Sequence, residues 1–166
     1  MISYRKKICL IGDFAVGKTS LVKRYVDNVF SEDYMTTVGV SIVTREVRLD
    51  RDALVKLVIW DIAGADRLST VSRAYLAGAN GCIFVADGTR PDTFDAALEL
   101  KKSVDAALNH PRSISLINKH DLADEWRIDS EQRAQLSDWK LTSAKTGEGV
   151  EDAFLALARA FLDDAR

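Results

Sequence analysis

Short apolar runs rich in β-branched residues alternate with longer amphipathic segments along the whole of this chain. Residues 8–11 and 82–86 are almost continuously apolar, as strands are when helices cover both faces of a sheet. Shorter runs at residues 114–117 and 139–141 have the same character. This alternation is typical of βαβ units, so the sequence predicts an α/β fold containing about four parallel strands.

Two further segments, residues 38–49 and 54–60, flank the turn-forming sequence Asp50-Arg51-Asp52. Polar and apolar residues partly alternate in the first of them, which is the pattern of a strand with one exposed face. We therefore expect a hairpin that adds one antiparallel strand at the edge of a mostly parallel sheet of about six strands.

Two segments have the periodicity of amphipathic helices. Apolar residues recur at three- and four-residue steps over residues 93–109 and again over residues 150–162. Thr93 or Asp92 can cap the first helix. No repeat or linker divides the chain, and its 166 residues suit one hydrophobic core, so we expect a single domain over residues 1–166.

The net charge of −2 is too balanced to predict binding to nucleic acid or to an anionic membrane. Cys9 and Cys82 lie inside apolar runs, so they are expected to be small buried hydrophobic residues. No apolar stretch reaches the roughly 20 residues of a transmembrane helix. The ends of the chain have no secretory leader or lipidation motif, so we expect a cytoplasmic protein without a direct lipid anchor.

The first predicted strand is followed directly by the sequence Gly12-Asp13-Phe14-Ala15-Val16-Gly17-Lys18-Thr19. This sequence fits the pattern G-x-x-x-x-G-K-[ST] between a strand and a helix, which is the phosphate-binding loop of P-loop NTPases. The glycines let the backbone turn its N–H groups inward, toward phosphate oxygens. We expect Lys18 to neutralise the terminal phosphates and Thr19 to offer a hydroxyl ligand to Mg²⁺.

Two polar segments follow the last two predicted strands: Asn118-Lys119-His120-Asp121 and Ser143-Ala144-Lys145. Both should lie at the edge of the sheet that carries the phosphate loop. Guanine presents two adjacent hydrogen-bond donors that the Asp121 carboxylate can accept, whereas adenine presents no such pair. A carboxylate left unpaired by the wrong base is costly, so Asp121 is expected to select guanine. The stems of Lys119 and Lys145 could enclose the ring.

With these motifs in this order, the chain resembles a small GTPase of the Ras superfamily, closest to the Rab branch, over almost its whole length. Thr36-Thr37 before Val38-Gly39-Val40 resembles the first switch, and residues 60–64 resemble the opening of the second. The resemblance implies a three-layer αβα fold with a six-stranded sheet and about five helices. It also implies a monomeric switch that binds GTP or GDP with Mg²⁺. Because the chain stops after its last amphipathic segment, it resembles prokaryotic members in particular.

The same resemblance assigns roles to single residues. Lys18, Thr37 and Gly64 are implied to act on the γ-phosphate, and Thr19, Thr37 and Asp61 to hold Mg²⁺. Phe30 is implied to pack edge-on against guanine, and Tyr34 to lie over the phosphates. The full set implied to contact the nucleotide is Gly12, Asp13, Phe14, Ala15, Val16, Gly17, Lys18, Thr19, Ser20, Phe30, Tyr34, Thr37, Gly64, Asn118, Lys119, Asp121, Ser143, Ala144 and Lys145.

Two positions depart from the family pattern. Ala65 occupies the place of the glutamine that orients the attacking water, and an alanine methyl group cannot do so. Phe14 replaces a small residue and would obstruct an arginine finger from an activating protein. The sequence therefore predicts slow hydrolysis unless Asp66, Arg67 or a partner residue positions the water.

Three functions stay open. The first is a GTP-binding switch that recruits effector and regulator proteins through residues 31–41 and 65–75. Trp60 and Tyr75 are either partner contacts or core residues there. The second is a scaffold that holds GTP or GDP permanently, which Ala65 and Phe14 favour. The third, an ATP-dependent phosphotransferase, is disfavoured by the guanine-type motif and by the absence of a recognisable acceptor pocket in the sequence.

Overall fold

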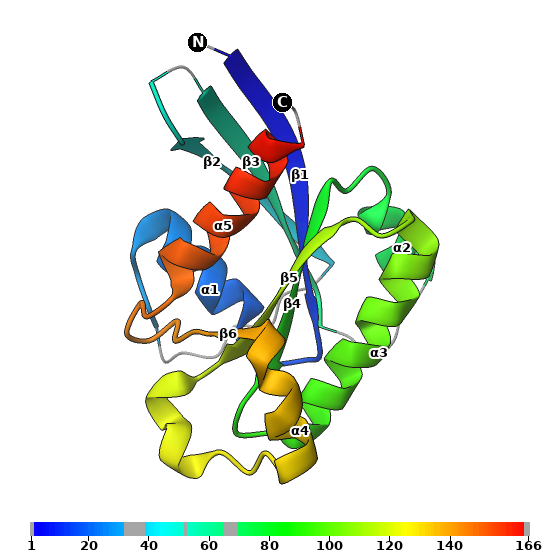
Figure 1. The fold of residues 1–166 in the computed structure, drawn as a ribbon, viewed down its shortest axis with the longest axis vertical. Coiled ribbons are helices and arrows are strands. Elements are labelled where there is room, and N and C mark those ends of the chain that lie inside the picture. The colour runs from blue at the N-terminus through cyan, green and yellow to red at the C-terminus, as the bar shows by residue number, and fades with distance from the viewer. Residues whose placement is uncertain (1, 32–38, 52, 65–69, 165–166) are drawn as a thin grey trace.

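The computed structural model describes residues 2–31, 39–51, 53–64 and 70–164. Figure 1 shows the fold, coloured in chain order; the two 3-10 helices among these residues are named η1 and η2. The elements are β1 (Ile2–Gly12), α1 (Lys18–Asp27), β2 (Val40–Arg48), β3 (Ala53–Ile62), α2 (Thr70–Leu76), β4 (Gly81–Asp87), α3 (Pro91–Leu108), β5 (Arg112–Asn118), η1 (His120–Glu125), α4 (Ser130–Gln135), η2 (Leu136–Asp138), β6 (Trp139–Leu141) and α5 (Val150–Asp163).

The strands form one six-stranded sheet in the order β2-β3-β1-β4-β5-β6. Strand β2 pairs antiparallel with β3, while β3, β4, β5 and β6 join their other neighbours in parallel. The antiparallel strand lies at the edge of the sheet, because β2 has β3 as its one neighbour in the strand order. These pairings confirm the predicted hairpin and the predicted mostly parallel sheet.

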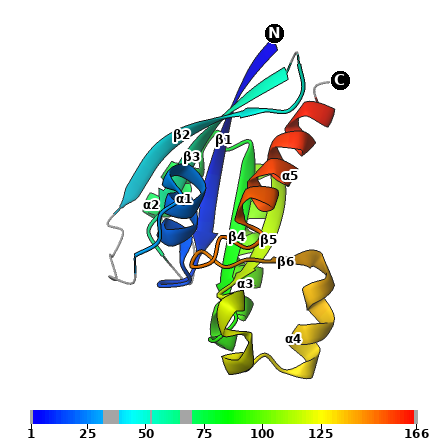
Figure 2. The ribbon, with the colours of Figure 1, turned by 90° about the vertical axis from the view of Figure 1, so that its left-hand side faces the viewer.

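Helices cover both faces of this sheet, as Figures 1 and 2 show. Helices α1 and α5 share one core with the strands, in which the Tyr25 and Phe154 rings stack with centroids 3.9 Å apart. Helices α2 and α3 pack on the opposite face, where Leu76, Phe84 and Leu100 are almost fully buried. The described residues contain five α-helices, so the three-layer fold is confirmed.

Strand β1 is longer than its apolar run. It starts at Ile2, and residues 2–7 pair with β3 but not with β4. The outer half of the strand lies beyond the two-sided core, so Arg5 is exposed and Lys6 and Lys7 are half-buried. This half could not be recognised as a buried strand because polar side chains occupy it. Helix α2 and the 3-10 helix η1 were not predicted either.

The two cysteines are neighbours on adjacent strands, since Cys9 is the register partner of Cys82. Both are free and fully buried. Burial raises the pKa of the Cys9 thiol to about 12 and raises that of Cys82 further, so both thiols stay protonated at neutral pH. Both cysteines are therefore small buried hydrophobic residues, as expected.

The parallel strands β1, β4, β5 and β6 all end at the same edge of the sheet. The loops that follow β1, β5 and β6 carry the phosphate motif and the two guanine-type motifs. Separately, none of the described helices is both long enough and apolar enough to cross a membrane.

Candidate nucleotide-binding site

The phosphate loop connects β1 to α1 and is tightly enclosed by its neighbours. A Cβ atom at Gly12 would lie 2.4 Å from the Val85 carbonyl oxygen on β4. Gly17 has a φ of 100°, and a Cβ atom there would lie 2.3 Å from Asn118 Nδ2. Both motif glycines are therefore required by close approach, and Gly17 also by its backbone conformation.

Lys18, the first residue of α1, turns back into the loop. Its side chain is buried, and Nζ donates to the carbonyl oxygens of Gly12, at 3.0 Å, and Asp13, at 2.9 Å. Burial lowers the pKa of Lys18 to about 8, while the negative charges of Asp61 and Asp13 act in the opposite direction. A phosphate group beside this ammonium would raise its pKa again by stabilising the charged form, which is the electrostatics expected of a phosphate-binding lysine.

The predicted metal ligands Thr19 and Asp61 meet at the start of α1 and the end of β3. Thr19 Oγ1 donates to Asp61 Oδ2 at 2.6 Å, and the Asp61 side chain is almost fully buried. A hydroxyl oxygen and a carboxylate oxygen side by side fit Mg²⁺, a hard cation that prefers oxygen ligands. These two residues would hold the ion, whereas Thr37 lies outside the described residues.

Gly64 lies directly against the phosphate loop. A Cβ atom there would lie 2.5 Å from Phe14 Cα and 2.7 Å from Phe14 N. The Phe14 side chain is 47% exposed, so the ring stands at the surface of the loop. Phe30 is half-buried and packs against the α1–α5 core. Tyr34 and Ala65 lie outside the described residues, so their implied positions stay predictions.

Asn118 joins the phosphate loop to the loop after β6. Its side chain is buried; Nδ2 donates to the Val16 carbonyl oxygen at 3.0 Å. Its Oδ1 accepts from Thr142 Oγ1 at 3.2 Å and from the Ala144 N–H at 3.3 Å. One amide side chain, itself part of the motif at residues 118–121, thus fixes the three predicted motifs relative to one another.

The predicted guanine selector, Asp121, is an exposed residue of η1. Its Oδ1 accepts from Ser143 Oγ at 2.7 Å, and Ser143 is fully buried. This contact ties residues 118–121 to residues 143–145. We call these two loops the base end of the site, and the phosphate loop with Lys18 its phosphate end. Lys145 is exposed, while Lys119 extends its ammonium group toward the phosphate loop. The predicted enclosure of a ring by the two lysine stems therefore stays a prediction.

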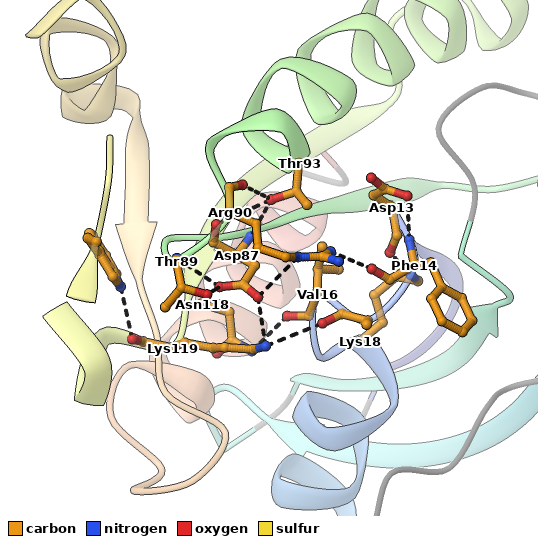
Figure 3. A network of polar contacts seen from close by, with 12 residues as sticks. Asp13, Phe14, Val16, Lys18, Asp87, Thr89, Arg90, Thr93, Asn118 and Lys119 are labelled. Atoms are coloured by element: carbon orange, nitrogen blue, oxygen red, sulfur yellow. Dashed lines mark hydrogen bonds and ion pairs between the residues drawn. The ribbon is translucent and has the colours of Figure 1, made fainter. Parts of the chain in front are cut away.

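Figure 3 shows a polar network that the sequence did not predict. At its centre is Asp87, the buried last residue of β4, which forms an ion pair with Lys119 at 2.6 Å. Arg90 Nη2 donates to the Phe14 carbonyl oxygen at 2.5 Å. A carboxylate directly after the apolar run 82–86 was the available signal for Asp87. Nothing local indicated Arg90.

A second unpredicted contact supports the loop after β6. Arg24, on α1, donates through Nε to the Ala144 carbonyl oxygen at 2.8 Å and through Nη2 to that of Lys145. The same helix begins at the phosphate loop. Helix α1 therefore connects the phosphate end of the site with its base end.

Comparison with known proteins shows the family to which this chain belongs. The chain matches the Ras family model over residues 7–163. It is 34% identical to the Ras-related protein Rab-32B of Dictyostelium discoideum, over 96% of this chain and 65% of that protein. It is 32% identical to the Ras-related protein Rab-7L1 of Rattus norvegicus, over 96% of this chain and 83% of that protein.

A third relative is the Ypt/Rab-type GTPase YPT7 of Saccharomyces cerevisiae, 35% identical over 94% of this chain and 81% of that protein. The chain thus spans just under two thirds of Rab-32B and more of the other two proteins. The match of the family model covers nearly the whole chain, including the phosphate loop and both loops of the base end. The chain therefore belongs to the Ras family, as a Rab-like small GTPase.

Proposed function

We propose that this protein is a guanine-nucleotide switch that hydrolyses GTP slowly, in the presence of Mg²⁺, and recruits effector proteins in its GTP-bound form. The observation that carries the guanine part is the Asp121 carboxylate, which Ser143 holds beside the loop fixed by Asn118. An acceptor in that position suits the paired donors of guanine and rejects adenine. Residues 1–166 act as one domain in this proposal, which the single sheet supports.

Slow hydrolysis is inferred from two residues, Ala65 and Phe14. Gly64, which precedes Ala65 in the chain, lies against the Phe14 backbone in the phosphate loop, since a Cβ atom there would lie 2.5 Å from Phe14 Cα. An alanine methyl group offers no hydrogen bond to a water molecule, whereas a glutamine amide would. The half-exposed Phe14 ring stands on the same loop, where it would hinder an external arginine.

The rate of a single turnover tests this proposal. Purified protein is loaded with GTP, Mg²⁺ is added, and phosphate release is followed for wild type, Ala65→Gln and Phe14→Ser. We expect slow release by wild type and release roughly 100-fold faster or more for Ala65→Gln, since a positioned catalytic group contributes about 10²- to 10⁴-fold. A wild-type rate as fast as that of Ala65→Gln would contradict the proposal.

The same assay decides the second candidate function, a scaffold that never turns over. Ala65 and Phe14 favour it because both weaken hydrolysis without weakening the contacts of the base end. If wild type and Ala65→Gln both release no phosphate over many hours while GTP stays bound, the scaffold is the correct function. Measurable release by wild type excludes it.

The switch itself can be followed through Trp60. This residue is half-buried, and its ring centroid lies 6.3 Å from that of Tyr75. Tyr75 belongs to the expected effector region 65–75, and Trp60 lies on β3 near both expected regions. Ile42, its register partner on β2, is 50% exposed. We expect the tryptophan fluorescence to change when GDP is exchanged for a non-hydrolysable GTP analogue, and the change to disappear in Trp60→Phe. An unchanged spectrum in wild type would contradict switching at this surface.

A further inference from the structure

Three consecutive carbonyl groups of the phosphate loop, those of residues 14–16, each accept a hydrogen bond from a side chain outside the loop (Figure 3). Arg90 Nη2 donates to the first at 2.5 Å and Lys119 Nζ to the second at 3.4 Å. Asn118 Nδ2 donates to the third at 3.0 Å. The donors come from the carboxyl ends of β4 and β5, so the loop is held from one side.

This arrangement fixes the direction of three amide groups. The peptide unit is planar and trans, so the N–H of a residue points opposite to the carbonyl group of the residue before it. The structure has no cis peptide bond among its described residues. Drawing the three carbonyl groups outward therefore turns the N–H groups of residues 15–17 away from the donors. Consecutive N–H groups on one side of a turn form an anion-binding nest.

The donor to the Phe14 carbonyl forms an ion pair with a buried acid. Asp87 is only 1% exposed, and its Oδ2 lies 2.6 Å from Lys119 Nζ and 3.6 Å from Arg90 Nε. Its Oδ1 accepts from the N–H and from the hydroxyl group of Thr89, at 2.9 and 2.7 Å. One carboxylate thus holds two cations, each of which binds a carbonyl group of the phosphate loop.

Arg90 itself is fixed at both ends. Its carbonyl oxygen accepts from Thr93 Oγ1 at 2.7 Å, and it is the N-cap residue of α3, followed by Pro91 at the first helical position. The guanidinium group then spans from the carboxylate to the loop: Nη2 donates to the Phe14 carbonyl oxygen, and Nε lies 3.6 Å from Asp87 Oδ2, an ion pair beyond hydrogen-bond distance. A planar guanidinium group can keep both contacts at once, which a lysine ammonium group on a flexible stem does less well.

We propose that Asp87 and Arg90 form a positioning pair for the phosphate loop: they hold the Phe14 carbonyl outward, so that the N–H of Ala15 faces a bound phosphate. The proposal rests on the proposed binding of guanine nucleotides. It assigns Arg90 an effect on the phosphate part of the ligand alone, because its contacts are with the loop and not with the base end.

The test compares the dissociation rate of a fluorescent GDP analogue from wild type, Arg90→Ala, Arg90→Lys and Asp87→Asn, all with Mg²⁺. A hydrogen bond from a charged group corresponds to roughly a 10- to 100-fold change, so Arg90→Ala should release GDP that much faster. Arg90→Lys should recover part of the loss. Arg159→Ala, an exposed arginine on α5, is the control and should behave as wild type. Equal rates for Arg90→Ala and wild type would overturn the proposal.

Two readouts separate positioning from general loss of structure. The affinity ratio of GDP to ADP should be the same in Arg90→Ala and wild type, since the base end is unchanged. Hydrogen exchange of the Ala15 amide in the GDP complex should be faster in Arg90→Ala, with exchange of the core strands unchanged. A lower GDP-to-ADP ratio, or an unchanged Ala15 amide, would overturn the positioning role.

These outcomes are distinct from a failure of the proposed function. If wild type binds no guanine nucleotide, the proposed function fails and the positioning role fails with it. If wild type binds GDP tightly and Arg90→Ala does so equally, the positioning role alone fails. Should Asp87→Asn not fold, because it alters a buried carboxylate, the two Arg90 variants still decide the question, since Arg90 is 38% exposed.

Discussion

The phosphate end and the base end of the site are built in different ways. The phosphate end consists of backbone groups and a buried lysine: Lys18 is 6% exposed and donates to two carbonyl groups of its own loop. The base end presents exposed groups, Asp121 and Lys145, on a 3-10 helix and a loop. Buried Ser143 donates to Asp121, and buried Asn118 accepts from the N–H of Ala144, the residue before Lys145.

This difference indicates that one end of the site contributes mainly affinity and the other mainly selectivity. A buried ammonium group is costly until an anion pairs with it, so the phosphate end should supply most of the affinity. An exposed carboxylate costs little when the site is empty, but it is left unpaired when the wrong base covers it, so the base end should supply selectivity. The first four predictions below test this difference, from the largest expected effect to the smallest, and the fifth tests the lowered pKa of Lys18 on which it depends.

The largest effect is expected from Lys18→Ala. It removes the buried cation from the phosphate end, and loss of one member of a buried charge pair costs about 3–5 kcal/mol. The dissociation constant for GDP, measured by calorimetry, should rise more than 100-fold. Lys102→Ala, which alters a lysine 74% exposed on α3, should leave it unchanged. A change below tenfold would mean that the phosphate end does not dominate affinity.

Asp121→Ala should act mainly on selectivity. It removes a charged acceptor worth about 1.5–3 kcal/mol per hydrogen bond, so the ratio of GDP to ADP affinity should fall by roughly 10- to 100-fold. Asp124→Ala, an exposed residue of the same 3-10 helix, is the matched control. Competition between the two nucleotides measures the ratio. If it stays at the wild-type value, Asp121 does not select guanine.

Gly17→Ala should disturb both ends together, because Gly17 lies where the two ends meet. Its Cβ atom would lie 2.3 Å from Asn118 Nδ2, and overpacking costs typically about 1–3 kcal/mol. Gly78→Ala is the control: Gly78 also has a positive φ, of 74°, but a Cβ atom there meets nothing within 4 Å. Thermal unfolding should show a larger loss for Gly17→Ala. Equal losses would assign the whole effect to backbone strain.

The pH dependence of GDP binding should show a smaller effect of the phosphate end. The pKa of Lys18 is about 8 in the protein alone, and a bound phosphate raises it by favouring the charged form. Binding therefore takes up a proton above pH 8, so affinity should be flat below pH 8 and fall by up to about tenfold at pH 9. Calorimetry in buffers of different ionisation enthalpy detects the proton.

In the protein without nucleotide, the lowered pKa of Lys18 makes stability rise with pH, whereas it makes GDP affinity fall with pH. The unfolded chain has an ordinary lysine pKa of 10.5, above the value of about 8 in the fold. Between those pH values the native state binds fewer protons than the unfolded state, so this residue makes the free energy of unfolding rise with pH. Lys18→Met should remove that rise in urea titrations. Parallel curves for both proteins would contradict the lowered pKa.

The elements that the sequence predicted well are those whose signal is local. Residues 82–86 are apolar throughout because helices cover both faces of β4. The amphipathic stripe over residues 150–162 matched α5, with its apolar side on the sheet. Helix α2 was missed because it has only seven residues, too few for a clear period. The outer half of β1 was missed because its side chains are polar.

The same distinction between local and non-local signals separates the site residues that were predicted from those that were missed. The residues of the phosphate loop are consecutive, and glycine, lysine and threonine at fixed spacing describe its chemistry. Arg90 and Arg24 were missed because their partners are distant in sequence, 76 residues away for the Phe14 carbonyl and 120 for that of Ala144. No local pattern connects such positions.

The sequence by itself determined which backbone could bind phosphate, because the left-handed φ at Gly17 and the spacing to Lys18 are local properties of the chain. Only the tertiary structure decided which side chains bind the carbonyl groups of that loop. The parallel register that pairs Gly12 with Val85 brings the end of β4, and with it Asp87, beside the loop. Register is a property of the packed sheet, and the contacts it creates exist only once the strands have paired.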